Sequence, residues 1–125
     1  MSRQKKAADG ALESAVMEAL WANGGWMTTS EILNGLETER PLAYNTVTTI
    51  VARLFDKGRL ERQRDGRAFA YRPGQSREDY TAMRMSEVLN GTEDRPAALA
   101  RFVETLGPSD QTQLRRLLAQ LRRGG

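Results

Sequence analysis

The sequence predicts a mostly helical chain with one small β-hairpin, and three observations support this fold class. Apolar residues recur every three to four positions from Leu12 to Leu54, as they do along the buried face of a helix. The period changes to two on either side of Asp65-Gly66, where the hairpin is expected. A helical period returns after Ser76. We therefore expect an N-terminal domain, residues 1–75, and a C-terminal helical region, residues 76–125.

Composition narrows the classes of function. The 125 residues include no cysteine and no histidine. Without these ligands and bases, we expect no metal, no cofactor and no enzymatic activity. The N-terminus lacks the apolar run of a signal peptide, and no segment approaches the ~20 apolar residues of a membrane helix. The sequence therefore predicts a soluble cytoplasmic protein.

The first two predicted helices have clear start and stop signals. Asp9 is the expected N-cap of the first helix and Gly24-Gly25 its stop. The second helix begins at Thr28, because its hydroxyl and the carboxylate of Glu31 have the spacing of a capping box. The loop that follows contains Pro41, which interrupts helical structure. The apolar faces are Leu12, Val16, Ala19 and Leu20 in the first helix, and Ile32, Leu33 and Leu36 in the second.

The third predicted helix, from about Ala43 to Lys57, has an unusual outer face. At 100° per residue its core stripe is Val47, Ile50, Val51 and Leu54. The opposite side of its first two turns carries short, uncharged side chains in place of the usual Glu and Lys. They are Asn45, Thr46, Thr48 and Thr49.

The hairpin follows this helix directly. "LERQR" and "AFAYR" flank Asp65-Gly66, a pair typical of a type I′ turn, in which both central residues have positive φ. Leu60, Phe69 and Tyr71 are expected on the buried side, while the arginines remain solvated.

Three further helices are expected after Ser76, separated by Asn90-Gly91 and Gly107-Pro108. About 50 residues of short helices do not easily build a core of their own, so we interpret them as a dimerisation region. The alternative is that they fold back on the N-terminal domain. The residues expected at the dimer interface are Tyr80, Met83, Leu99, Phe102, Val103, Leu106, Leu114, Leu117, Leu118 and Leu121.

The outer face of the third helix suits the DNA major groove. Asn pairs bidentately with adenine, and Thr donates, accepts or touches a thymine methyl. Residues 40 to 77 also carry nine basic against three acidic residues, whereas the chain as a whole has a net charge of +3. The residues expected at the DNA backbone are Thr29, Ser30, Tyr44, Arg53, Lys57, Arg62, Arg64 and Arg67.

Each of these features alone has a simpler interpretation. A threonine-bearing helix face is often only solvated, and an arginine-bearing hairpin is often a soluble edge. The order helix, capped helix, threonine-faced helix and basic hairpin favours a winged helix-turn-helix that binds duplex DNA. A winged-helix module for protein–protein assembly remains the alternative from another class.

The motifs also resemble a known family. "LESAVMEALW", "AYNTVTTIVARLFDKGRLERQRDGRAFAYRP" and "LARFVE" are similar to the penicillinase repressors of the BlaI/MecI type, over about residues 11 to 122. The resemblance implies a homodimeric repressor that binds inverted repeats in front of antibiotic-resistance or related genes. It also carries Asn45, Thr46, Thr48 and Thr49 over as base-facing positions.

The resemblance further implies a way to relieve repression. In well-known members, a β-lactam-activated membrane sensor protease leads to cleavage of the repressor at an Asn-Phe bond in a C-terminal helix. The matching bond here is Arg101-Phe102, in which the first residue differs from that pattern. Phe102 also fits an ordinary core position on its helix. A regulator that senses a small ligand directly remains the alternative to control by proteolysis.

Overall fold

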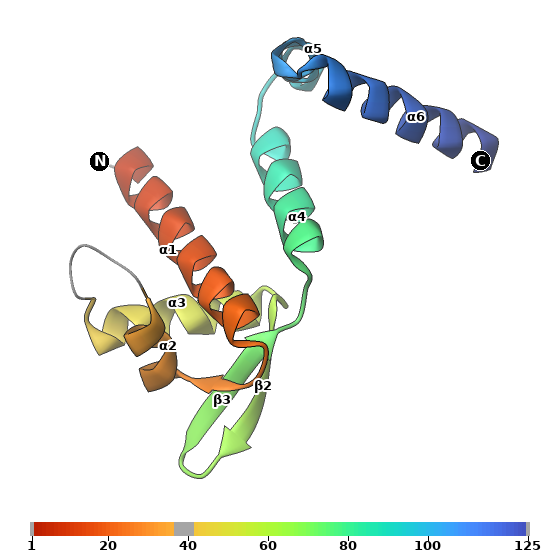
Figure 1. Ribbon diagram of the computed structural model, residues 1–125. Coiled ribbons are helices and arrows are strands. Elements are labelled where there is room, and N and C mark those ends of the chain that lie inside the picture. Colours follow the sequence, from red (N-terminus) through yellow and green to blue (C-terminus); the bar gives the residue numbers. More distant parts are fainter. Residues whose placement is uncertain (1, 37–41, 125) are drawn as a thin grey trace. The chain divides into compact units, whose positions relative to one another are not determined.

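The N-terminal part of the chain is built around the apolar faces of three helices. The computed structural model describes residues 2–36 and 42–124, and the side chains of residues 10–36 and 42–124. The predicted loop at Pro41 therefore lies outside the described residues. The elements, shown in Figure 1, are α1 (Ser2–Asn23), β1 (Met27–Thr28), α2 (Thr29–Gly35), α3 (Tyr44–Asp56), β2 (Leu60–Asp65), β3 (Ala68–Pro73), α4 (Arg77–Asn90), α5 (Arg95–Thr105) and α6 (Pro108–Gly124).

The described chain is mostly helical with a small antiparallel sheet, which confirms the predicted fold class. It divides into two compact units that meet between Thr81 and Ala82, within α4. In the N-terminal unit the β2–β3 hairpin extends away from α1, α2 and α3 (Figure 1). The core includes the whole predicted stripe of α3, whose four side chains are at most 2% exposed, together with Val16 and Leu20 of α1 and Ile32 of α2.

The helix boundaries confirm most of the predicted signals. Thr28 is the N-cap of α2: its Oγ1 accepts a bond from the Glu31 amide at 3.3 Å, and Glu31 Oε1 accepts one from the Thr28 amide at 3.2 Å. Gly24 and Gly58 follow α1 and α3 with φ of 75° and 77°, a conformation that favours glycine. The predicted cap at Asp9 is wrong, because α1 is already helical from Ser2 through a run of good helix formers.

The sheet has a third strand that the sequence did not reveal. The connection between α1 and α2 pairs with β3 as an edge strand, with Met27 opposite Tyr71 and Thr28 opposite Ala70. The strand order is β1-β3-β2. A strand of two residues is too short to show a period of two, so only its partner identifies it.

The hairpin turn also differs from the prediction. β2 continues through Asp65, and the two loop residues are Gly66 and Arg67. Gly66 has a φ of 65°, and no described residue other than glycine has a positive φ. These signs belong to a type II′ turn, which needs glycine only at its first central position. The predicted type I′ turn centred on Asp65 and Gly66 is therefore wrong.

A buried ionic cluster joins α1 to the start of the hairpin. Arg59 is only 2% exposed, and its Nη1 lies 3.8 Å from Oε2 of Glu13, itself 6% exposed. The Nζ of Lys57 lies 3.1 Å from Oε1 of the same carboxylate. The prediction that the arginines around the hairpin remain solvated is therefore wrong for Arg59. The cluster places Glu13 between two cations at the end of α3.

Replacing Glu13 by glutamine is expected to lower the free energy of unfolding by about 3 kcal/mol, because a buried guanidinium then loses its counter-charge. Urea denaturation of the whole chain, followed by circular dichroism, measures the change. The matched control is Glu18→Gln, which removes an exposed ion pair with Arg77 and should change the free energy by less than about 1 kcal/mol. Equal effects of the two substitutions would contradict a special role for the buried carboxylate.

The first turn of α4 packs on α1. The rings of Trp21 and Tyr80 meet edge to face at 5.5 Å, and the Trp21 indole donates a 2.9 Å hydrogen bond to the Gln75 carbonyl. Arg77 pairs with Glu18 at 3.1 Å. Ser76 Oγ accepts a bond from the Asp79 amide, in keeping with the predicted cap. Because Tyr80 is 4% exposed in the N-terminal core, the prediction that it lies at a dimer interface is wrong.

The C-terminal unit comprises the rest of α4 with α5 and α6, which end and begin at the predicted glycine breaks. Asp94 caps α5 by accepting a bond from the Ala97 amide at 3.1 Å. From residue 82 to residue 124 no side chain is buried within the single chain. The exposed large apolar residues here are Met85, Val88, Leu99, Phe102, Val103, Leu117, Leu118 and Leu121.

Candidate nucleic-acid interface

The base-facing residues expected from the sequence gather on the outer surface of α3. Val47 and Ile50 hold the helix to the core, and the side chains between them point away from it. Asn45, Thr46, Thr48 and Thr49 are all exposed. Tyr44 is 50% exposed at the first helical position, after Ala43, which makes no side-chain cap. The start of α3 is therefore an accessible, uncharged surface.

Two threonine hydroxyls on this surface already use their protons. Thr48 Oγ1 donates to the Tyr44 carbonyl and Thr49 Oγ1 donates to the Asn45 carbonyl, both at 3.0 Å. Each oxygen then has only lone pairs left to offer a base, together with its methyl group. Such groups suit the amino protons of adenine or cytosine and the methyl of thymine. Asn45 can both donate and accept.

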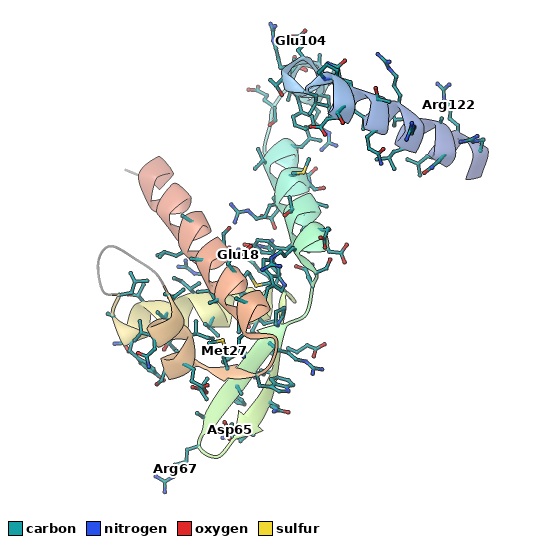
Figure 2. The ribbon with its side chains drawn as sticks, in the orientation of Figure 1. Glu18, Met27, Asp65, Arg67, Glu104 and Arg122 are labelled. Atoms are coloured by element: carbon teal, nitrogen blue, oxygen red, sulfur yellow. The ribbon has the colours of Figure 1, made fainter. Side chains whose placement is uncertain are left out.

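The hairpin brings two exposed arginines to the far end of the N-terminal unit. Arg67 projects from the turn, away from the helices (Figure 2). The guanidinium of Arg64, on β2, lies over the Phe69 ring at 5.0 Å. Arg53 lies in the last turn of α3 and is also exposed. These three cations are spread from the helix to the tip of the hairpin.

Two other residues expected at the DNA backbone have partners within the chain. Lys57 is paired with Glu13, since α1 places that carboxylate beside the end of α3. The Arg62 guanidinium lies 3.9 Å from the ring centroid of Phe55 and 4.3 Å from that of Phe69. The sequence showed the charges of Lys57 and Arg62 but not these contacts. The Glu13 carboxylate competes with a phosphate for Lys57.

The positive charge of residues 40 to 77 is therefore less available to DNA than the number of basic residues indicates. In this segment Lys57, Arg59, Arg72 and Arg77 each pair with a carboxylate. Arg72 also lies over the Trp26 ring at 4.5 Å. Arg64 and Arg67 on the hairpin are exposed.

The two residues expected to contact the DNA backbone at the start of α2 differ in exposure and lie beside a carboxylate. Thr29 is half-buried and Ser30 exposed, at the first two positions of the helix. The carboxylate of Glu31 lies at the same helix end, where it completes the capping box. Its negative charge opposes the approach of a phosphate.

Metal ligation and membrane insertion are the two other functions that the described residues allow us to examine. Among these residues, no three acidic, histidine or cysteine side chains are grouped so that they could hold a metal ion. None of the described helices has both the length and the apolar character needed to cross a membrane.

Comparison with known proteins gives a consistent set of matches. The family model described as penicillinase repressor matches residues 10–120. The transcriptional regulator BlaI of Mycobacterium tuberculosis is 40% identical over 118 residues, which cover 92% of this chain and 86% of that protein. The penicillinase repressor of Bacillus licheniformis is 30% identical over 78 residues, covering 62% of this chain and 60% of the relative. The solution structure of the DNA-binding domain of the repressor BlaI is 31% identical, with a TM-score of 0.47, and covers 54% of this chain and 82% of that domain.

Proposed function

Since the chain belongs to the penicillinase repressor family of winged-helix, DNA-binding transcriptional regulators rather than to a family of enzymes, we propose that it acts as a cytoplasmic homodimer on an inverted-repeat operator. By binding there it blocks access to a promoter. Residues 1–75 form the DNA-binding domain of this proposal, and residues 76–125 the dimerisation region. Residues 76–81 of the second region belong to the first compact unit, because the first turn of α4 packs on α1.

The observation that carries DNA binding is the exposed, uncharged start of α3 together with the arginines of the hairpin. In this arrangement Asn45, Thr46, Thr48 and Thr49 face base edges in the major groove. Arg53, Arg64 and Arg67 contact phosphates on either side and fix the register of the helix. Thr29, Ser30 and Tyr44 are uncharged backbone contacts in the same proposal.

Dimerisation is supported by the apolar surface of α5 and α6. Leu99, Phe102 and Val103 on α5 are between 41% and 45% exposed, and Leu118 and Leu121 on α6 are 55% and 72% exposed. Apolar side chains at these spacings are usually buried in a monomeric protein or at an interface between subunits. A second copy of the chain is the partner that symmetry favours, because two recognition helices then match an inverted repeat.

The regulated genes of this proposal are those for β-lactam resistance or a related function. Relief of repression involves a membrane sensor protease, with cleavage at Arg101-Phe102. Both residues are exposed on α5. Adding β-lactams to the purified protein bound to DNA separates proteolytic control from direct ligand sensing. Release of DNA by the antibiotic alone favours a ligand-sensing regulator, whereas no release without a protease favours cleavage.

Substitution of α3 and of the hairpin tests the assignment of base and backbone contacts. Asn45→Ala should relax sequence preference at particular operator positions, with a loss of about 1 to 3 kcal/mol on the preferred sequence only. Arg64→Ala should weaken binding to operator and unrelated duplexes alike, because a phosphate contact carries no sequence information. Competition binding with single-base operator variants measures both effects.

The reverse pattern, in which Arg64→Ala alters specificity and Asn45→Ala does not, would overturn the assignment. Failure of the unmodified chain to bind any duplex at low salt would favour the alternative, a winged-helix module for protein–protein assembly. In that case the surface of α3 would be the contact surface for another protein.

A further inference from the structure

Arg62 occupies a position that its charge alone does not explain. It lies on β2, and its guanidinium carbon is 3.9 Å from the ring centroid of Phe55, near the end of α3. The same carbon is 4.3 Å from the ring centroid of Phe69, on β3. One side chain therefore contacts aromatic rings from two elements while belonging to a third. The α3 helix and both strands of the hairpin meet at this contact.

Both ring contacts are close to van der Waals distance, so the guanidinium of the exposed Arg62 side chain links the helix to the hairpin through the two rings. Arginine is suited to this place, because its planar, weakly hydrated head stacks on rings more readily than a lysine ammonium. The Arg64 guanidinium also lies over Phe69, at 5.0 Å. Arg62 and the proposed phosphate-binding residue Arg64 therefore share the Phe69 ring.

The contact between Arg62 and Phe55 affects the angle at which the hairpin leaves the helices. The hairpin extends from the three-helix core, and Arg67 projects from its turn, away from the helices (Figure 2). A small rotation at the base of a hairpin becomes a large displacement at its tip. Contact between Arg62 and Phe55 opposes such a rotation at the point where the hairpin passes α3.

We propose that Arg62 is a positioning residue, which holds the hairpin at a fixed angle to α3 through Phe55 and Phe69, so that base and phosphate contacts form together. The inference rests on the proposed DNA-binding function and assigns Arg62 a role other than the phosphate contact expected from the sequence. The charge of Arg62 matters through the rings, and the DNA is contacted by its neighbours on the hairpin.

Four variants of the full chain test this role: Arg62→Lys, Arg62→Met, Phe55→Leu and the pair Phe55→Leu with Arg62→Met. Operator affinity is measured across a range of salt concentrations. Arg62→Lys keeps the charge but loses the stacking, and we expect it to weaken binding about as much as Arg62→Met, by roughly tenfold. Phe55→Leu should have a similar effect. The double variant should be no weaker than either single one, because both remove the same contact.

Arg72→Met is the matched control. Arg72 also lies over a ring, that of Trp26, and pairs with Glu61, but neither partner belongs to α3. Its loss should leave operator affinity within about twofold. Near-wild-type binding by Arg62→Lys, with a tenfold loss and a reduced salt slope in Arg62→Met, would overturn the proposal in favour of a phosphate contact. Additive losses in the double variant would also overturn it.

A measurement without DNA separates this inference from the proposed function. Hydrogen exchange at the hairpin amides should be faster in Arg62→Met and in Phe55→Leu than in wild type, while the amides of α1 remain protected. If the wild-type chain binds no duplex, the proposed function fails, and faster hairpin exchange still supports the mechanical link. Unchanged exchange in both variants would show that Arg62 does not hold the hairpin.

Discussion

Raising the salt concentration from about 50 to about 200 mM is expected to weaken operator binding by about 10³. The reason is that the proposed function assigns three arginine contacts with phosphate to each subunit, at Arg53, Arg64 and Arg67, and so about six to a dimer. Each phosphate that is neutralised releases counterions, and six give a slope of about −5 in a plot of log affinity against log salt. Fluorescence anisotropy with a labelled operator measures this slope.

The slope also discriminates between the sequence-based and the structural assignments. If Lys57 and Arg62 left Glu13 and the two phenylalanines to contact phosphate, about ten contacts would give a slope near −9 and a loss of about 10⁵. Arg67→Ala provides the internal calibration. It removes one contact from each subunit and should reduce the slope by about 2. Affinity that does not change with salt would contradict DNA-backbone contacts altogether.

Introducing a charge on the apolar face of α6 is expected to separate the dimer. Leu118→Glu places a carboxylate at a side chain that is 55% exposed in the single chain and covered in the proposed dimer. Loss of the dimer removes the avidity of two half-sites, so affinity for the full operator should fall by about 10² or more, while affinity for a single half-site stays the same. Sedimentation velocity and binding to both duplexes measure the two consequences.

The matched control is Gln120→Glu, which adds the same charge two residues along, on another side of α6. It should leave both the mass in solution and the operator affinity unchanged. A Leu118→Glu protein that still sediments as a dimer would place the interface elsewhere. A monomeric protein that keeps full operator affinity would contradict the need for two linked half-sites.

Local signals predicted the elements of this fold well where a segment carries its own pattern. The core stripe of α3, the capping box at Thr28 and the glycines that end α1 and α3 were all readable from spacing. The edge strand at Met27 was not, because a two-residue strand exists only through its pairing with β3. The turn type failed for a related reason: register across the hairpin decided which residues form the loop.

Prediction of the candidate site had a different obstacle. A helical wheel is enough to predict that Asn45 and Thr49 are exposed. It cannot show which cations have internal partners, since Glu13 and Lys57 are 44 residues apart in the chain. The hydroxyl of Thr49 is a subtler case, because its bond to the Asn45 carbonyl reduces what the side chain can offer a base. The sequence shows which side chains are charged or polar, but it does not show which of them already interact with other residues of the chain.

The packing of Tyr80 and Arg77 against α1 has a consequence for how the gene can vary. The first turn of α4 shares its environment with Trp21 and Glu18, so a change there is felt by the helix bundle that carries α3. Selection should therefore couple residues 76–81 to α1 rather than to the remainder of their own helix. A recombination point that exchanges C-terminal regions between relatives preserves both halves if it falls after Thr81, and it mismatches a core contact if it falls at Pro73.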